Sequence, residues 1–374
     1  MRLHKLSLFA IATTMLLVTG CAKSGDQTSD ANITVTTGAE SSNSEVSGDT
    51  TEDGNPEDTT GSNTENNAEV SYPITITHAL GETVIENKPE RVATISWSNQ
   101  DTVLALGVVP VGVSTANFGE VNEDGLLPWT AAAYKELGVE DPVVFSDTDG
   151  LDFEAISDAN PDVILAAYSG ITQEEYDTLS MIAPVVAYPE YAWQTYWRDQ
   201  TIMNATGMGM KAEGEALVAQ TEALIAEKLS AYPELAGKSA AFFYFNESDL
   251  SSFYVYFPTD PRGEYLNDLG LVFPESVMAL SDGTSFTVEI SAENIDLVKD
   301  IDIIVAYGDE ATVKALQADT LVGQIPAVAN GAVATVGHNS ALAASCNPTV
   351  LSIPSTIDEY LKVLAGAAAK VSNE

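Results

Sequence analysis

A helix-length segment followed by a buried strand is written twice in this chain. FEAISDANPDVILAAY at 153–168 returns in altered form as AENIDLVKDIDIIVAY at 292–307. Each copy opens near a glutamate, Glu154 or Glu293, and ends its run of β-forming residues on a tyrosine. A chain that repeats such a unit so far apart is expected to fold into two lobes built to one plan.

Short apolar runs alternate with helical patterns in both halves of the chain. This alternation is typical of βα units, which place parallel strands in a central sheet. We therefore expect an α/β fold of two Rossmann-like lobes, each with a largely parallel sheet. The predicted strands are RVATIS, VVPVGVS, PDVILAAY and PVVAYP in the first lobe, and SAAFFYF, SFYVYF, IDIIVAYG and AVATVG in the second.

One long helical pattern, 197–231, separates the two lobes, which then comprise 72–196 and 232–374. Its second half repeats apolar residues at three and four places, whereas Gly207 and Gly209 are expected to interrupt the first half. Two lobes joined by one long helix leave a ligand cleft between them, at the C-terminal ends of the strands.

Ser98 and Asp101 have the spacing of a capping box before the helical pattern NQDTVLALG. In such a box the serine accepts a backbone N–H and the acidic side chain reaches back to the capping residue. The sequence therefore predicts that Asp101 serves the helix start.

The first residues have the features of an export signal. Basic residues precede an apolar stretch that ends in LVTGC, so 1–20 is expected to be a signal peptide and Cys21 the lipidated residue. Acyl chains (palmitate among them) at about 0.8 kcal/mol per buried CH₂ would anchor Cys21 to the outer face of the cell membrane. The polar segment 21–71 is too poor in aliphatic residues to fold and is expected to be a disordered tether.

Charge and cysteine content argue against a nucleic-acid-binding protein and against an intramolecular disulfide. A formal net charge of −40, from 55 acidic and 15 basic residues, argues against nucleic-acid binding because phosphate would be repelled. With Cys21 lipidated, Cys346 has no partner for an intramolecular disulfide and is expected to be a buried thiol. We expect a monomer and leave the role of Cys346 open.

Enzyme chemistry finds no support among the motifs of the chain. The sequence contains no Gly-x-Ser-x-Gly elbow, no His-Glu-x-x-His pair and no phosphate-binding loop of the Gly-x-x-x-x-Gly-Lys type. The pattern DTDG at 147–150 lacks the further ligands of a calcium loop and is interpreted as a turn. We expect a non-enzymatic protein with no metal ligands and no cofactor of its own.

Two stretches carry a resemblance to a known family. ITITHALGETVIENKPERVATISWSNQDTVLALGVVPVGVS (74–114) and PDVILAAYSGITQEEYDTLSMIAPVVAYP (161–189) resemble the ferric-siderophore substrate-binding proteins of ABC importers. The resemblance implies a lipoprotein that captures a ferric siderophore and delivers it to a permease dimer with its ATPase, for iron uptake. The family also contains haem- and cobalamin-binding members.

Aromatic side chains follow the predicted strands, where they would face the cleft. Rings supply area for the apolar rim of a ferric chelate, and a few donors would fix its orientation. The siderophore fills the coordination shell of the iron, so iron would be bound only through it. The candidate ligand-binding residues are Trp97, Phe118, Tyr168, Ser169, Tyr191, Trp193, Arg198, Tyr256, Arg262, Phe286, Tyr307 and His338.

Positive charge is scarce in the expected cleft. Apart from Arg91, which resembles a structural position of the family, only Arg198 and Arg262 supply guanidinium groups in the folded part. Triply anionic catecholate complexes call for a basic pocket, so a neutral or cationic hydroxamate chelate is favoured. Arg198 either holds a chelate oxygen or forms a surface ion pair with Asp199 or Glu190.

Two other functions stay open. A haem-binding or cobalamin-binding protein of the same fold is one, and for haem Tyr168 or His338 could supply an axial ligand. A structural or adhesion lipoprotein with no transport role would also explain the tether and the acidity. The permease and the particular siderophore cannot be read from the sequence.

Glu154 and Glu293 occupy matching places in the repeat. They are either ordinary helix-start carboxylates, favoured by the helix dipole, or a pair that a partner reads. The resemblance implies the second role, because members of the family present one glutamate per lobe to arginines of the permease. We expect both residues to dock the permease.

Overall fold

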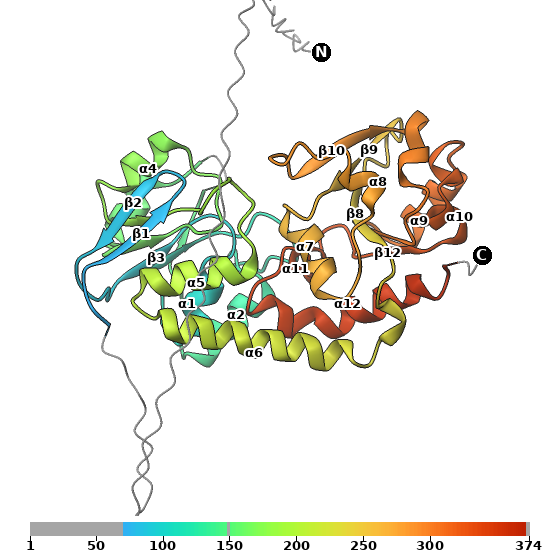
Figure 1. Cartoon of the computed structure of the whole chain (residues 1–374). Helices are drawn as coiled ribbons and strands as arrows, with labels where there is room; N and C mark the ends of the chain where they lie inside the picture. The colour runs from blue at the N-terminus through green and yellow to red at the C-terminus, as the bar shows by residue number, and fades with distance from the viewer. Residues whose placement is uncertain (1–69, 148–149, 372–374) are drawn as a thin grey trace, which may run out of the picture. The chain divides into compact units, whose positions relative to one another are not determined.

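The computed structural model describes residues 70–147 and 150–371 of the chain. The expected signal peptide, Cys21 and nearly all of the expected tether lie outside these residues. No helix within the described ranges is long and apolar enough to cross a membrane. Two α/β lobes with central sheets follow one another along the described chain (Figure 1), which confirms the expected fold class.

The N-terminal lobe begins with an antiparallel hairpin and continues into a five-stranded parallel sheet. The sheet order is β5-β4-β3-β6-β7, and the strands β3 and β6 at its centre are buried along their whole length. Continuous apolar strands are what a sheet covered on both faces requires. The strands are β1 (Ile74–His78), β2 (Gly81–Ile85), β3 (Val92–Thr94), β4 (Gly112–Ser114), β5 (Val144–Phe145), β6 (Val163–Leu165) and β7 (Val185–Val186).

Four helices connect the strands of the parallel sheet: α1 (Gln100–Ala105), α2 (Pro128–Glu136), α3 (Phe153–Asp158) and α4 (Gln173–Leu179).

The capping box that the sequence predicts at the start of α1 is wrong. The helix begins after Asn99 with no side-chain cap among the described residues. The Asp101 carboxylate instead accepts hydrogen bonds from Trp129 Nε1 at 2.8 Å, Thr130 Oγ1 at 2.9 Å and Thr349 Oγ1 at 2.6 Å. Since Thr349 belongs to the other lobe, Asp101 joins the two lobes.

The connection between the lobes is two helices, not one. Helix α5 (Trp197–Gly207) ends before a short break, and α6 (Lys211–Leu229) runs on to the second lobe, alongside the C-terminal helix (Figure 1). Gly209 lies in the break with φ +70°, and a Cβ there would overlap the Tyr72 hydroxyl. Only glycine meets both conditions without strain, so the predicted interruption of the helix is confirmed at Gly209.

The C-terminal lobe has a mixed sheet of order β10-β9-β8-β11-β12. Strands β8, β11 and β12 are parallel, but β9 is antiparallel to both of its neighbours. The expectation of a largely parallel sheet is therefore wrong for this edge of the second lobe. The strands are β8 (Ala240–Phe245), β9 (Ser252–Tyr256), β10 (Thr287–Ser291), β11 (Ile303–Ala306) and β12 (Val333–Thr335).

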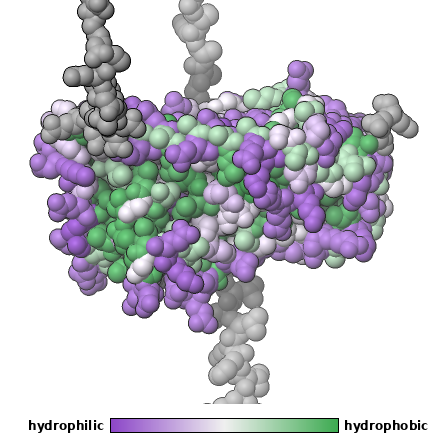
Figure 2. Space-filling model, turned by 90° about the horizontal axis from the view of Figure 1, so that it is seen from below, coloured by the Kyte–Doolittle hydropathy of each residue, from purple (hydrophilic) through white to green (hydrophobic). Residues whose placement is uncertain are grey.

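Short helices surround this sheet, and the long α12 packs against α6. The α-helices are α7 (Pro261–Asp268), α8 (Glu275–Met278), α9 (Glu310–Ala318), α10 (Pro326–Asn330), α11 (Ala341–Ser345) and α12 (Ser352–Ala368). The 3₁₀ helices are η1 (Pro233–Leu235), η2 (Ala292–Val298) and η3 (Val322–Gln324). The view from below in Figure 2 shows apolar residues gathered over the N-terminal lobe and hydrophilic residues around them.

The repeated pattern occupies equivalent places in the two lobes. In the first copy α3 leads into β6, which pairs in parallel with β3, the strand of its sheet that comes first along the chain. In the second copy η2 leads into β11, which pairs in parallel with β8, again the strand of its sheet that comes first along the chain. The two-lobe interpretation of the repeat is thus confirmed.

Candidate ligand-binding site

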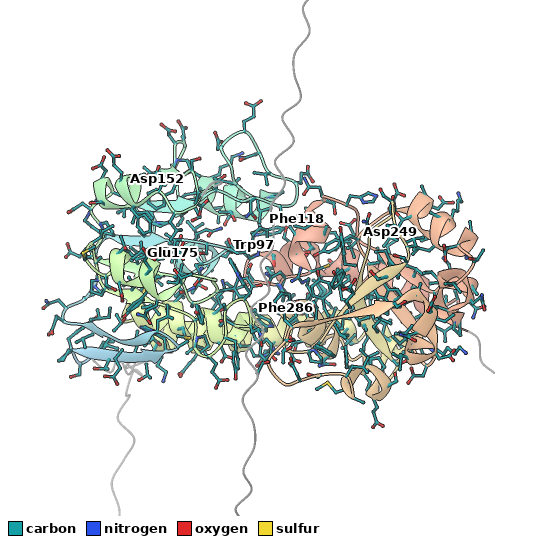
Figure 3. All side chains as sticks on the ribbon, turned by 90° about the horizontal axis from the view of Figure 1, so that it is seen from above. Trp97, Phe118, Asp152, Glu175, Asp249 and Phe286 are labelled. Atoms are coloured by element: carbon teal, nitrogen blue, oxygen red, sulfur yellow. The ribbon has the colours of Figure 1, made fainter. Side chains whose placement is uncertain are left out.

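A cavity of about 790 Å³ is lined by residues of both lobes. Most of the residues lining it lie at or after the C-terminal ends of strands, those of β3 to β7 in the N-terminal lobe and of β8, β9, β11 and β12 in the other. Trp97 and Phe118 from the first lobe and Phe286 from the second all line the cavity, and they lie near one another where the lobes meet in the view from above (Figure 3). This is the place expected for a ligand of open α/β sheets.

Aromatic rings form much of the wall and contact one another edge to face. The Tyr168 and Trp193 ring centroids lie 5.4 Å apart, and Phe118 meets Tyr307 of the opposite lobe at the same distance. Trp193 lies against Gly170, where a Cβ would overlap the indole. Nine of the twelve predicted ligand-binding residues line the cavity: Trp97, Phe118, Tyr168, Trp193, Tyr256, Arg262, Phe286, Tyr307 and His338.

The loop that carries Trp97 has an unusual backbone. Ser96 and Ser98, on either side of the indole, have φ values of +63° and +55°, in the left-handed region that non-glycine residues seldom occupy. Such conformations cost about 1–3 kcal/mol each and persist only where the surroundings impose them. The Trp97 Nε1 is buried and has no hydrogen-bond partner among the described residues.

A buried asparagine, Asn99, follows this loop and bonds to the backbone before it and to the backbone after β6. Asn99 Nδ2 donates to the carbonyl oxygens of Ile95, at 2.8 Å, and of Tyr168, at 2.9 Å. Its Oδ1 accepts from the Tyr168 backbone N–H at 3.1 Å and from Asn204 Nδ2 on α5 at 3.0 Å. One amide thereby ties together the ends of β3 and β6, which carry the cavity residues Trp97 and Tyr168.

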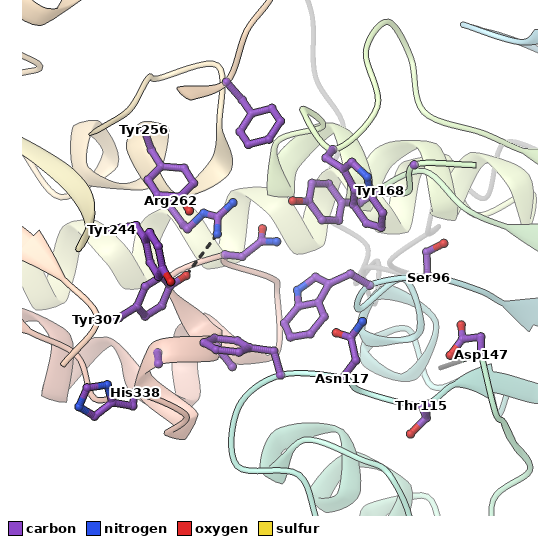
Figure 4. A pocket seen from close by; sticks show the side chains of 18 of the residues that line it. Ser96, Thr115, Asn117, Asp147, Tyr168, Tyr244, Tyr256, Arg262, Tyr307 and His338 are labelled. Atoms are coloured by element: carbon purple, nitrogen blue, oxygen red, sulfur yellow. Dashed lines mark hydrogen bonds between the residues drawn. The ribbon is translucent and has the colours of Figure 1, made fainter. Parts of the chain in front are cut away.

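Arg262 is the one Arg or Lys side chain among the described residues that line the cavity. Its Nε and Nη2 each donate to one carboxylate oxygen of Asp260 at 2.7 Å, and Nη1 donates to Tyr307 Oη at 3.2 Å. The guanidinium also lies over the Tyr256 ring, 4.2 Å from its centroid. Figure 4 shows the guanidinium between Tyr256 and Tyr168 at the centre of the wall.

Carboxylates outnumber that cation on the wall. Asp147, Glu175 and Glu247 all line the cavity, and His338 Nε2 lies 3.7 Å from Glu247 Oε1. Burial raises the pKa of the Asp147 carboxyl group above its ordinary value, against hydrogen bonds that lower it. The wall therefore does not suit a ligand of high negative charge.

Two of the tyrosines that line the cavity, Tyr168 and Tyr307, stay protonated at neutral pH. Burial raises the pKa of the Tyr168 and Tyr307 hydroxyl groups well above the ordinary value, although Arg262 lowers both. They are thus hydrogen-bonding phenols at this pH. In the described ranges, no three His, Cys, Asp or Glu side chains are grouped so that they could hold a metal ion.

Three predicted ligand-binding residues lie outside this cavity. Ser169 is fully buried and donates to the Ala166 carbonyl oxygen at 2.8 Å. Tyr191 is 46% exposed and lines a smaller hollow nearby. Arg198 forms ion pairs with Glu222 at 2.6 Å and Asp268 at 2.9 Å. The ion-pair alternative is therefore the one observed, but the partners are not the predicted Asp199 and Glu190.

Several polar wall residues were missed by the sequence analysis. Thr115 and Asn117 directly follow the strand VGVS, and Asn246 and Glu247 directly follow the strand SAAFFYF, so the rule that found Phe118 could have found them. The others that the sequence analysis missed are Ser96, Asp147, Glu175 and Asn347.

Glu154 and Glu293 are both exposed. Glu154 lies in the first turn of α3 and Glu293 in the first turn of η2, so each lobe carries one. The structure thus places both in corresponding positions. Their docking role stays a prediction.

The protein has two α/β lobes, a helical connection between them and a cavity lined by aromatic rings at the strand ends. This architecture defines a two-lobed solute-binding protein. Residues 92–339, more than half of the chain, match the model of the family described as "Periplasmic binding protein". The chain belongs to this family, and the resemblance stated from the sequence is confirmed.

Solved and curated relatives agree with this assignment. The Streptococcus pneumoniae TIGR4 protein PiaA, solved in complex with ferrichrome, is 51% identical, with a TM-score of 0.78 over 80% of this chain and 100% of that one. The "Probable siderophore-binding lipoprotein YfiY" of Bacillus subtilis is 25% identical over 65% of this chain and 71% of its own length. The "Ferric enterobactin-binding periplasmic protein FepB" of Escherichia coli O6:H1 is 23% identical over 71% of this chain and 84% of its own length.

Proposed function

We propose that this protein is an extracytoplasmic receptor that binds a ferric hydroxamate siderophore and delivers it to an ABC importer. The observation that carries the proposal is the wall of the cavity. It combines rings from both lobes with the hydrogen-bond donors of Arg262, and its carboxylates outnumber its Arg and Lys side chains. A compact, neutral chelate with an apolar rim and a few exposed oxygens fits such a wall.

The size of the aromatic wall accounts for tight binding. Each ring can bury at most about 150–250 Å², which at about 25 cal/mol/Å² corresponds to several kcal/mol per ring before the costs of association. Three or four rings therefore suffice for nanomolar affinity, about 12 kcal/mol. PiaA, the 51% identical relative, was solved with ferrichrome, a chelate of this class.

The iron needs no ligand from the protein, because the three hydroxamates of such a siderophore already complete its coordination. The protonated phenols of Tyr168 and Tyr307 agree with this, since both serve as neutral donors or apolar surface. The protein then acts by binding alone, as a carrier of the chelate.

Delivery uses the outer surface of the two lobes. Glu154 and Glu293, one on each lobe and both exposed, present carboxylates to basic residues of the permease dimer. Exposed ion pairs are individually weak, about 0–1 kcal/mol, but two at a fixed separation set the orientation of the encounter. Lipidation of Cys21 keeps the monomeric protein at the membrane where the permease lies.

A thermal-shift panel tests the proposal. Ferrichrome is expected to raise the melting temperature, because a ligand that binds only the folded state stabilises it. Ferric enterobactin, haem and cobalamin are expected to leave it unchanged. If haem alone raises the melting temperature and also gives a Soret band, the ligand is haem and not a siderophore. If no compound changes the melting temperature, a structural lipoprotein is favoured.

A further inference from the structure

The cation of the cavity is neutralised from within the protein. Asp260 is 1% exposed and holds Arg262 through two parallel hydrogen bonds of 2.7 Å, the bidentate geometry that is strongest for this pair. Asp260 does not itself line the cavity. It lies behind the guanidinium and cancels its charge where no ligand competes for it.

The guanidinium nevertheless keeps donors for a ligand. Of its five N–H groups, Asp260 takes one on Nε and one on Nη2, and Tyr307 takes one on Nη1. One N–H on Nη1 and one on Nη2 have no partner among the described residues. Since Tyr256 stacks on the group at 4.2 Å and Asp260 grips it, these donors have a fixed direction.

We propose that Asp260 is a specificity-determining residue. By cancelling the charge of Arg262 it leaves the cavity with directed N–H donors but no net positive charge, so that the site accepts neutral or cationic ferric chelates and rejects anionic ones. The proposal rests on the proposed function and adds to it the charge class of the ligand and the residue that sets it.

The carboxylates of the wall act in the same direction. Glu247 accepts from Thr312 Oγ1 at 2.5 Å and lies on the cavity wall, as do Asp147 and Glu175. With Arg262 neutralised, these groups determine the sign of the potential that a ligand meets. A chelate with three negative charges would face repulsion that no described cation of the wall offsets.

Asp260→Asn is the informative variant. Asp260 also caps α7, accepting from the Arg262 backbone N–H at 2.8 Å, and asparagine is an equally good capping residue. The change therefore keeps the helix start and one acceptor for the guanidinium but removes the cancelling charge. Asp358→Asn is the matched control, because Asp358 is exposed and pairs with Lys228, outside the cavity.

The test compares two probes, neutral ferrichrome and triply anionic ferric enterobactin, by calorimetric titration of the full chain at low salt. The wild type and Asp358→Asn are expected to prefer ferrichrome to the same extent, within about twofold. In Asp260→Asn the ratio of the two affinities is expected to move toward ferric enterobactin by about tenfold or more. This shift should shrink in high salt, because screening weakens the unpaired charge.

The outcomes separate the two proposals. If the wild-type protein does not bind ferrichrome, the proposed function is overturned, and this inference with it. Normal ferrichrome binding with an unchanged ratio in Asp260→Asn would overturn the inference alone. If Asp260→Asn does not fold, Asp260→Ser, which also keeps a capping oxygen for α7, is titrated instead, and a ratio that fails to move toward the anionic chelate there overturns the inference.

Discussion

The side-chain amide of Asn99 bonds to both backbone groups of Tyr168. Nδ2 donates to the Tyr168 carbonyl oxygen at 2.9 Å, and Oδ1 accepts the Tyr168 N–H at 3.1 Å. Asn99 is fully buried, so neither bond competes with water. The contact holds the end of β6 against the end of β3, and with them the cavity residues Trp97 and Tyr168.

Asn99→Ala is expected to loosen the cavity and the fold together. The change leaves several buried backbone and side-chain groups without partners, each at a cost of about 1–3 kcal/mol. We expect the free energy of unfolding, measured by urea titration, to fall by about 3 kcal/mol and ferrichrome affinity to fall about tenfold or more. The control Asn267→Ala, at an exposed site paired with Glu264, should change neither by more than about 0.5 kcal/mol.

The aromatic wall of the cavity is expected to supply most of the binding energy for the chelate. Trp97→Ala and Phe286→Ala are each expected to weaken ferrichrome binding by about 1–3 kcal/mol, as measured by quenching of tryptophan fluorescence or by calorimetry. Tyr191→Ala is the control, since this ring lies outside the main cavity. Tyr168→Ala is less informative, because Tyr168 is 4% exposed and its loss would also destabilise the lobe. Wild-type affinity in both variants would contradict the role of the rings.

Asp101 gives the fold a pH dependence of known sign. Burial raises the pKa of its carboxyl group to about 6, against three hydrogen bonds that lower it. Because this value lies above that of the unfolded chain, about 3.9, the folded state binds more protons between these pH values. The contribution of Asp101 to stability is therefore complete below about pH 4 and is lost as pH rises through about 6.

Asp101→Asn should remove this dependence while keeping the shape of the side chain. Between about pH 4 and pH 7 the free energy of unfolding of the wild type is expected to fall by about 3 kcal/mol relative to the variant, at about 1.4 kcal/mol per pKa unit. Urea titrations across this range measure the difference. Parallel curves for the two proteins would show that Asp101 does not titrate differently on folding, and Asp141→Asn, an exposed change, serves as the control.

Glu154→Ala combined with Glu293→Ala is expected to separate capture from delivery. Both residues are exposed and lie outside the cavity, so ferrichrome affinity should stay unchanged. Uptake of radioactive iron and ligand-stimulated ATP hydrolysis by reconstituted transporter should be lost. Glu213→Ala with Glu227→Ala, two exposed changes on α6, removes the same charge and should transport normally. Transport at the normal rate by the first double variant would rule out the docking role.

The parts of the fold that repeat were predictable because hydrophobic periodicity is local. The pattern at 153–168 and 292–307 marked equivalent elements in both lobes, and the strand runs were found in both halves. The direction of β9 was not predicted, although the gap of a few residues between Phe245 and Ser252 is too short for a parallel crossover, which needs a dozen residues or more. Loop length was the signal that could have corrected it.

Only those site residues that directly follow a predicted strand could be predicted from the sequence. Rings after strands, such as Trp97 and Phe118, were found because strand ends converge at the cleft. Asp260 and Asn99 were not, because their importance comes from partners brought close by the fold. Arg198 was a candidate on residue type alone, and its ion pairs with Glu222 and Asp268 depend on the packing of α5, α6 and α7.

Calorimetric titration of the protein with ferrichrome at neutral pH shows whether the protein is a receptor for this chelate. We expect one binding site per chain and a dissociation constant below about 1 µM, corresponding to more than about 8 kcal/mol. The affinity should fall in Trp97→Ala and stay unchanged in Tyr191→Ala. The absence of measurable ferrichrome binding to a folded wild-type protein would contradict the proposed function.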